Sequence, residues 1–435
     1  MCSEDGASNV AESAVMRNLI IVDPSLKDHR GHHFELSQLI ATEAARLGMS
    51  VHLLANVDFL DVSFGPNVTI HKLFDFTMYD RYVGGADRSE ESAGEASEVF
   101  ADMLDDALSQ CGATVEDIIL CHTTDAAMFR NMLAYHQKFG AEALPLHLAT
   151  PYDERVMPGK MADFPLGQTI AELKRIASGK VFFWAETTPL ANHLSALWNA
   201  RVEPLILPIK SATAPLKNPS SPTIELSYLG AAREEKGFTL LPDLIAGVLD
   251  EPACEPIRFF VQCSPQIIGY LPPIKAALAR LEPLEGDRVA LQREPMASDV
   301  YARVLEQSDG LLLLYDAANY RVRGSGIAWD GVTSGKVLVT RSDTFPASLL
   351  VHGGGVVADD IDGWIKGVVD LCRNWETQQA AVKAQAEFFA KWASAERYLE
   401  RIATRPNREV NALCAPFALI RSTRPALLRQ LGEAV

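Results

Sequence analysis

The sequence has no apolar run of about 18 residues, the length that a helix needs to cross a bilayer. Residues 1–17 are polar and acidic, without the apolar core of a signal peptide. The net charge of −16 argues against a nucleic-acid partner and gives no support for peripheral docking on anionic lipid. We therefore expect a cytoplasmic protein without a transmembrane segment, in which residues 1–17 are disordered.

Motifs for metals and redox cofactors are also missing. The seven cysteines are scattered, with no CxxC pair and no Cys/His spacing typical of zinc. No GxGxxG follows the first predicted strand, so a nicotinamide-dependent oxidoreductase has no support. The sequence predicts no bound metal and no cofactor.

The chain does have enough length and apolar residues for two cores: 435 residues, 48% of them hydrophobic. Proline, serine and small residues gather in KSATAPLKNPSSP, a composition typical of a linker. The part of the chain before this linker and the part after it each begin with a strand, a turn and a helix, which predicts an α/β fold. We predict Rossmann-like domains at 18–210 and 223–400, a linker at 211–222, and a final segment, 401–435, that packs on the first domain.

Short apolar runs predict the strands of both domains, because strands of parallel sheets are buried on both faces. In the first domain the runs are 18–22, 51–55, 117–121, 144–149, 181–184 and 205–208. In the second domain they are 224–229, 258–263, 288–291, 311–315, 336–340 and 355–358. Near the end, apolar residues at helical spacing predict one long helix through Phe388, Trp392, Ala395, Leu399 and Ile402.

The stretch 311–340, LLLLYDAANYRVRGSGIAWDGVTSGKVLVT, predicts a strand, a loop, a short helix and a second strand. Ligands of open parallel sheets lie at the carboxyl ends of the strands. Gly324-Ser325-Gly326 lets a ligand approach the backbone, and the helix that follows offers unpaired N–H groups and a partial positive charge. This predicts a site for an anion such as phosphate; a glycine turn that merely joins strand to helix is the alternative.

Two cations follow the strand at 224–229. Arg233 and Lys236 lie at its predicted carboxyl end, where fixed positive charges neutralise a diphosphate. An ordinary charged loop is the alternative. In the first domain Glu186 precedes a helix that begins at Thr188 and Pro189, so we interpret this glutamate as structural.

The segment with Tyr315, Tyr320, Arg323, the Gly-Ser-Gly step and Asp330 resembles the donor site of retaining GT-B glycosyltransferases of the group 1 superfamily. In that superfamily the segment often carries two glutamates eight residues apart. Asp330 matches the second, and Val322 stands where the first would be.

The stretch from Gly230 to Lys236 is similar to the GRxxxEKG donor clamp of the same superfamily. It keeps the spacing of the clamp, but Ala231 occupies the usual arginine position and Arg233 follows two residues later. The resemblance covers most of residues 18–400.

The resemblance implies a GT-B fold, in which two Rossmann-like domains face a central cleft and a C-terminal helix crosses back to the first domain. It implies hexosyl transfer with retention, without a metal, from a nucleotide-diphosphate sugar to a hydroxyl of a glycan, lipid-linked or small-molecule acceptor. The residues that it implies for donor binding are Gly230, Arg323, Gly324, Ser325, Gly326, Ile327 and Asp330. Those for catalysis are Lys236, Arg233 and His122.

In the first domain, the resemblance implies that Gly31, His32 and His33 form a turn that lines the cleft on the acceptor side. A solvated helix start is the alternative, and a metal is disfavoured because no third ligand follows one turn later. His122 follows the strand 117–121 and can donate to a sugar hydroxyl, or serve as a capping or packed residue. A different reading of the chain is a nucleotide-sugar-binding or regulatory protein that has lost catalysis, as the departures at Val322 and Ala231 suggest.

Overall fold

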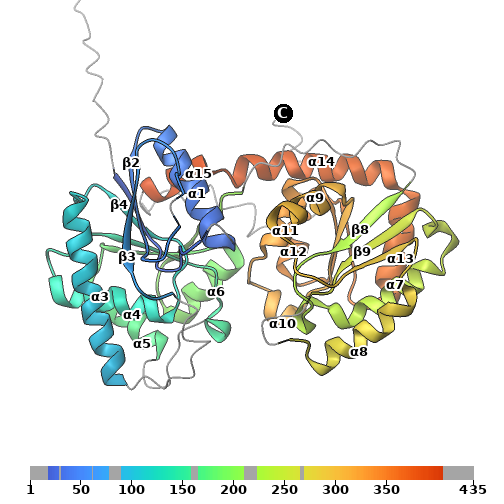
Figure 1. The fold of residues 1–435 in the computed structure, drawn as a ribbon, viewed down its shortest axis with the longest axis horizontal. Helices are drawn as coiled ribbons and strands as arrows, with labels where there is room; N and C mark the ends of the chain where they lie inside the picture. Colours follow the sequence, from blue (N-terminus) through green and yellow to red (C-terminus); the bar gives the residue numbers. More distant parts are fainter. Residues whose placement is uncertain are drawn as a thin grey trace, which may run out of the picture.

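The computed structural model describes residues 18–28, 31–60, 62–77, 90–157, 165–209, 223–264 and 269–404. Two separate parallel sheets lie side by side, each with helices packed around it (Figure 1). This confirms the predicted α/β class with two Rossmann-like domains. The predicted linker at 211–222, residues 1–17 and most of 401–435 lie outside the described residues.

The first sheet has seven parallel strands in the order β3-β2-β1-β4-β5-β6-β7. The strands are β1 (Asn18–Val22), β2 (Ser50–Asn56), β3 (Val68–Phe74), β4 (Ile118–Cys121), β5 (Leu146–Thr150), β6 (Val181–Ala185) and β7 (Val202–Pro204). The helices are α1 (Gly31–Arg46), α3 (Glu90–Gln110), α4 (Ala126–Phe139), the 3₁₀ turn Glu154–Val156, α5 (Leu166–Ile176) and α6 (Thr188–Trp198).

Successive side chains of these strands enter two different cores. Ile20 and Val22 pack with α3 and α4 on one face of the sheet, and Leu19 and Ile21 pack with α1 on the other. Burial on both faces explains why the strands are continuous apolar runs in the sequence.

Two features of the first sheet differ from the prediction. Strand β3 was not predicted, because most of this edge strand is only partly buried and its sequence VTIHKLF has no continuous apolar run. The strand predicted at 205–208 is wrong: the pairing with β6 involves Val202–Pro204 instead. Leu205 is buried in the core and donates its N–H to the Ala185 carbonyl of β6 at 2.8 Å, but the strand itself ends at Pro204.

The second sheet has six parallel strands in the order β10-β9-β8-β11-β12-β13. The strands are β8 (Ile224–Tyr228), β9 (Ile257–Gln262), β10 (Val289–Gln292), β11 (Gly310–Leu313), β12 (Val337–Thr340) and β13 (Gly355–Val357). The helices are α7 (Leu241–Leu249), α8 (Pro272–Leu281), α9 (Ser298–Gln307), α10 (Ala317–Tyr320), α11 (Gly326–Thr333), α12 (Phe345–Ser348) and α13 (Ile361–Arg373). Short 3₁₀ turns lie at Glu234–Lys236, Phe238–Leu240, Pro252–Cys254 and Glu282–Leu284.

The last two described helices connect the domains. Helix α14 (Trp375–Trp392) runs from the second domain toward the first, and α15 (Ala395–Ala403) lies beside α1 (Figure 1). The chain therefore crosses back as expected, but in two helices rather than one, because Ser394 accepts a hydrogen bond from the N–H of Arg397 and starts a new helix. None of the helices in the described residues is long and apolar enough to cross a membrane.

The docking of α15 predicts a stability effect. Ile402 is fully buried in the core that contains α1, so Ile402→Ala removes apolar contacts and leaves a cavity. We expect a loss of about 2–5 kcal/mol in the free energy of unfolding of the first domain, measured by urea denaturation. Leu197→Ala is the control, because that side chain is 51% exposed and its loss should change stability by about 0.5 kcal/mol or less. Equal urea midpoints for Ile402→Ala and the parent would contradict the docking.

Candidate active site

Each sheet has one place where the strand order reverses, and loops leave in opposite directions there. In the first sheet it lies between β1 and β4, and in the second between β8 and β11. Ligands of open α/β sheets bind outside the strand ends at such a switch point. The side chains beyond these four strands are therefore the first candidates for function.

Beyond β8, the loop places Lys236 beside a glycine. Gly230 has a φ of 98°, and a Cβ there would lie 3.1 Å from Lys236 Nζ and 2.9 Å from Ile327 Cδ1. The left-handed backbone of Gly230 favours glycine, and its lack of a side chain lets the ends of Lys236 and Ile327 approach the backbone. Lys236 Nζ also lies 5.9 Å from the centre of the Tyr315 ring.

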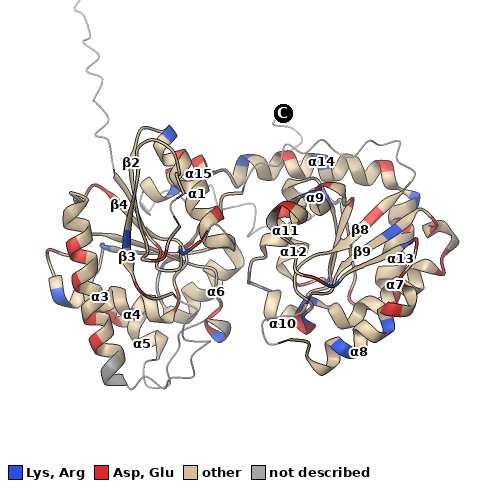
Figure 2. Ribbon diagram, viewed as in Figure 1, with Lys and Arg blue, Asp and Glu red and all other residues tan. Residues whose placement is uncertain are grey.

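Three cations meet around this loop. Burial, followed by repulsion from Arg233 and Arg323, lowers the pKa of Lys236 to about 8. Arg323 lies 5.5 Å above the Tyr320 ring, and Arg233 lies 3.5 Å from the Glu235 carboxylate. Basic residues colour the loops next to α10, near the strand ends of the second sheet (Figure 2). The carboxyl groups of Glu235 and, from the other domain, Glu186 oppose three basic side chains, so the positive groups prevail and the cluster attracts an anion.

The Arg233 guanidinium gives a further sign of a missing acceptor. Its Nε atom is buried and finds no hydrogen-bond partner among the described residues. A buried unsatisfied donor costs free energy unless a ligand or water accepts from it. The position suits an oxygen of a bound phosphate.

The Gly-Ser-Gly step begins α11, as predicted. The Ser325 hydroxyl caps the helix by accepting from the N–H of Ala328 at 3.3 Å, and it lies 3.1 Å from the Tyr315 hydroxyl. A Cβ on Gly326 would meet nothing within 4 Å, so a ligand has room to approach there. A Cβ on Gly324 would instead collide with the Glu186 carboxylate. Only the second glycine of the step therefore faces open space.

Glu186 reaches this step from the other domain. It follows β6, it is only 7% exposed, and burial raises its pKa to about 7, although Arg323 opposes the shift. The next residue, Thr187, donates its hydroxyl to the Val322 carbonyl oxygen at 2.7 Å. This contact was not predicted, because nothing local to Glu186 indicates which loop it meets.

Asp330 lies one helical turn beyond Gly326. Its carboxylate accepts a hydrogen bond from Tyr301 at 2.7 Å. Burial raises the pKa of Asp330 to about 6; Tyr301 opposes the shift, and the negative charge of Glu35 on α1 adds to it. Asp330 is thus partly engaged by Tyr301 and lies near the first domain.

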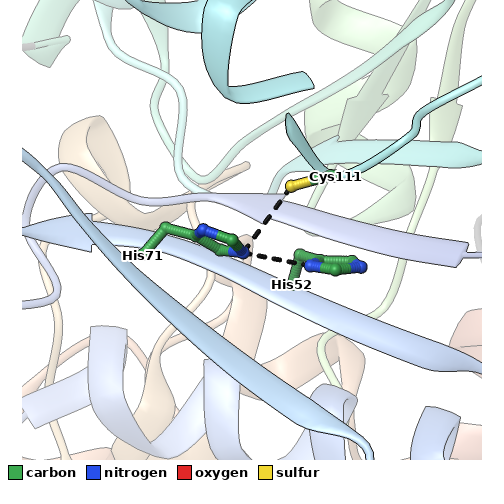
Figure 3. Close-up of side chains that lie close together, drawn as sticks. All are labelled: His52, His71 and Cys111. Carbon is green, nitrogen blue, oxygen red and sulfur yellow. Dashed lines mark hydrogen bonds between the residues drawn. The ribbon is translucent and has the colours of Figure 1, made fainter. Parts of the chain in front are cut away.

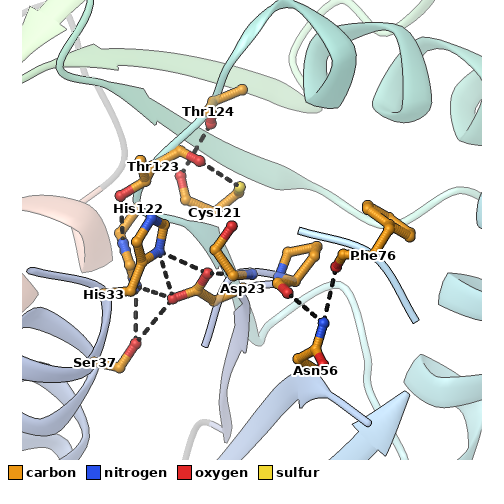
Figure 4. Close-up of polar contacts among 11 residues, drawn as sticks. Asp23, His33, Ser37, Asn56, Phe76, Cys121, His122, Thr123 and Thr124 are labelled. Carbon is orange, nitrogen blue, oxygen red and sulfur yellow. Dashed lines mark hydrogen bonds and ion pairs between the residues drawn. The ribbon is translucent and has the colours of Figure 1, made fainter. Parts of the chain in front are cut away.

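At the switch point of the first sheet, a buried carboxylate lies between two histidines (Figure 4). Asp23 follows β1, and its oxygens lie 2.8 and 3.0 Å from His33 Nδ1 and 3.3 Å from His122 Nε2. Burial raises the pKa of Asp23, but the two histidines outweigh it and hold this pKa well below its usual range. Asp23 was not predicted as a site residue.

His122 is an interior residue of this network. Its Nε2 lies 2.8 Å from the Ser37 hydroxyl and its Nδ1 lies 2.9 Å from the Thr123 hydroxyl, and the side chain is fully buried. In this arrangement His122 holds Asp23 and α1 in place, and its contact with a sugar hydroxyl stays a prediction. Asp23, His33 and His122 also offer three ligand atoms within 4.8 Å, although their hydrogen bonds account for these positions without a metal ion.

The residues predicted from the sequence thus form two groups. Lys236, Arg233, Gly230 and the segment from Arg323 to Asp330 lie together beyond β8 and β11. Gly31 is the first residue of α1 rather than part of a turn before it, and His32 is exposed there, with its ring centre 4.2 Å from that of His33.

Comparison with known proteins supports the fold assignment. No protein-family model and no curated protein matches the sequence. Solved structures do match: a trehalose 6-phosphate synthase from Burkholderia multivorans has a TM-score of 0.64 at 10% identity, over 89% of this chain and 97% of that one. The E. coli protein bound with UDP-2-fluoro glucose has a TM-score of 0.62 at 12% identity, over 89% and 98%.

A glycosyltransferase from Rickettsia africae has a TM-score of 0.62 at 9% identity, over 89% of this chain and 97% of that one. At such identities the likeness concerns the fold alone. The expected GT-B fold is thereby confirmed.

The contact between Glu186 and Gly324 predicts a coupled pair of mutations. Gly324→Ala places a methyl group where the carboxylate lies, so we expect a loss of about 1–3 kcal/mol in stability from overpacking. Glu186→Ala should cancel most of that loss in the double variant, which calorimetric melting of all four proteins would reveal. Gly326→Ala is the matched control, because its Cβ has space. Additive effects of the two mutations would show that these residues do not touch.

Proposed function

We propose that this protein is a glycosyltransferase that moves a sugar from a nucleoside-diphosphate sugar to a hydroxyl acceptor. The observation that carries the proposal is the convergence of Lys236, Arg233 and Arg323 with the start of α11 at the switch point of the second sheet. Fixed cations and backbone N–H groups at one point suit a diphosphate. The second domain would hold this donor, and the first domain the acceptor.

The same groups supply the chemistry of the reaction. When the bond from the sugar carbon to the phosphate oxygen breaks, negative charge grows on the departing diphosphate. Lys236 and Arg233 stabilise that charge without having to move, which lowers the barrier. The acceptor oxygen bonds to the sugar carbon on the face that the diphosphate leaves, so the configuration is retained, and the departing phosphate oxygen takes the proton of the acceptor hydroxyl. In this scheme protein cations take the place of a metal.

The solved structures with this fold indicate which donors to try first. Several are described as UDP-forming trehalose-phosphate synthases, and one is bound with UDP-2-fluoro glucose. UDP-glucose is therefore the first donor, followed by GDP- and ADP-sugars. The structure described as a complex with glucose-6-phosphate makes a sugar phosphate the first acceptor to test.

Glu186 compensates for the departure at position 322 in this proposal. The superfamily segment has a carboxylate there, whereas this chain has Val322, whose carbonyl is held by Thr187. Glu186 brings a buried carboxyl to the neighbouring Gly324 from the first domain. A carboxyl with a pKa of about 7 both accepts and donates hydrogen bonds, so it suits the hydroxyls of the donor sugar.

Hydrolysis of radiolabelled UDP-, GDP- and ADP-sugars tests the proposal before any acceptor is known. The assay is run in excess EDTA, where we expect slow release of sugar from one donor. Binding of a donor without release of sugar, with or without acceptors and divalent ions, would favour the alternative of a nucleotide-sugar-binding protein that has lost catalysis. Absence of binding to every donor would contradict both.

The first site prediction concerns pH and Lys236. The protonated amine binds the diphosphate, and in the free protein it loses its proton as the pH rises through about 8. Above pH 7 the nucleotide is already fully ionised, since the second phosphate pKa is about 6. We expect UDP affinity to fall roughly 10-fold or more from pH 7 to pH 9.5, with proton uptake on binding.

Two variants control the pH experiment. Lys236→Arg keeps the positive charge, so its affinity should depend much less on pH. Lys236→Ala should lower kcat by about 100-fold or more, because charge on the leaving group grows in the transition state. A parent-like pH profile in both variants, measured by titration calorimetry, would remove Lys236 from the site.

The second prediction concerns Asp330, which we propose accepts hydrogen bonds from the ribose hydroxyls. A nucleotide whose diphosphate meets Gly326 would extend its ribose about one helical turn further, to Asp330. Asp330→Asn should weaken binding of the bare nucleoside diphosphate by roughly 1–3 kcal/mol. Tyr301→Phe, which frees an acceptor on Asp330, should weaken it less. If Asp330→Asn and the parent bind equally well, the ribose is held elsewhere.

The third prediction separates sugar from nucleotide. Glu186→Gln keeps the shape of the side chain but removes its ability to carry a charge. We expect unchanged affinity for UDP and a loss of about 10-fold or more in kcat/KM for the UDP-sugar, since only the sugar would meet this carboxyl. A loss that is equal for UDP and UDP-sugar would assign Glu186 to the domain contact alone.

A further inference from the structure

A second cluster of ligand-type side chains lies away from the strand ends that face the second domain. His52 on β2, His71 on β3 and Cys111 directly after α3 point toward one another (Figure 3). His52 Nδ1 lies 3.0 Å from His71 Nε2, which lies 3.6 Å from Cys111 Sγ. His52 shares its sheet face with Leu54, two residues later, which packs against α3, so the cluster is on the face opposite α1.

The distances fit a tetrahedral metal ion. With zinc bonds of about 2.05 Å to nitrogen and 2.3 Å to sulfur, tetrahedral angles put two nitrogens about 3.3 Å apart and a nitrogen and a sulfur about 3.6 Å apart. The observed 3.0 and 3.6 Å lie close to both values, and all three ligand atoms lie within 4.8 Å of one another.

Hydrogen bonding alone satisfies this cluster poorly. His71 Nε2 carries either one hydrogen or one lone pair, yet it faces both His52 and Cys111. Neutral imidazole nitrogens and a thiol sulfur that releases its proton are the forms that bind a metal ion.

We propose that His52, His71 and Cys111 bind one zinc ion, with water as the fourth ligand. Two imidazoles and a thiolate are the nitrogen and sulfur donors that zinc prefers. Binding forms two Zn–N bonds and one Zn–S bond, and the thiol proton passes to solvent; no electron is transferred. The ion would join edge strand β3 to the end of α3. His52 and His71 are 19 residues apart and His71 and Cys111 are 40 apart, so the sequence alone did not predict this cluster.

Titration of the full-length protein with cobalt(II) tests the proposal, because cobalt replaces zinc and absorbs light. We expect one tight site per chain, a thiolate-to-cobalt charge-transfer band, release of about one proton, and loss of the band on adding zinc. Cys111→Ser should abolish the band, and His71→Gln should weaken binding at least about 10-fold. Cys254→Ser is the control, because Cys254 lies beside Cys372 and apart from this cluster.

Several outcomes would overturn the proposal. They are the absence of a charge-transfer band in the parent, a band that survives in Cys111→Ser, and cobalt bound without a thiolate band, which would place it elsewhere, for example at Asp23, His33 and His122. If a variant loses its native circular dichroism, a labelling experiment on the parent replaces the variants. Zinc must then protect Cys111 from a thiol reagent, as measured by peptide mapping. Equal labelling with and without zinc would rule the site out.

Discussion

The structure depends on one constraint: the two parallel sheets direct their carboxyl ends toward each other, so the loops beyond those ends must fit together. Two contacts show this fit. Thr187 donates a hydrogen bond to the Val322 carbonyl, and the Glu186 carboxyl packs against Gly324. Both residues of the first domain follow β6, and both of the second lie between β11 and α11. A ligand bound at Gly326 would therefore touch a surface to which both domains contribute, so its binding and the domain contact influence each other.

The two switch points differ in their charge. The second sheet surrounds its switch point with Lys236, Arg233 and Arg323, and the positive charge there has few local carboxylates to balance it. The first sheet buries Asp23 between His33 and His122, which closes that charge off from outside ligands. An anionic ligand is accordingly attracted to the second domain, while the switch point of the first domain is filled by its own buried side chains. This asymmetry agrees with the proposal that the second domain holds a donor carrying two phosphates.

Much of the fold was predictable because strands buried on both faces leave apolar runs in the sequence. There are two exceptions. Strand β3 is only partly buried, so its sequence contains no continuous apolar run. Leu205 belongs to an apolar run and is buried, but it lies just beyond the end of strand β7. The start of α11 at the glycine step was predictable because helix-start signals are local, and the roles of this step and of Lys236 stay predictions. Glu186 was interpreted as structural, since its meaning depends on a loop more than 130 residues away in the chain. The histidine and cysteine cluster escaped notice for the same reason.

The contact at Gly324 bears on the proposal that Glu186 supplies the carboxylate expected at position 322. A carboxylate at position 322, in the loop before α11, would lie close to the loop that carries Glu186, and two negative charges in one desolvated place repel each other strongly. With Val322 the loop carries no charge of its own there, and the buried Glu186 keeps Arg323 as its principal counter-charge. Under the proposed function the sugar meets a carboxyl group beside Gly324, and in this chain the first domain supplies that group as Glu186.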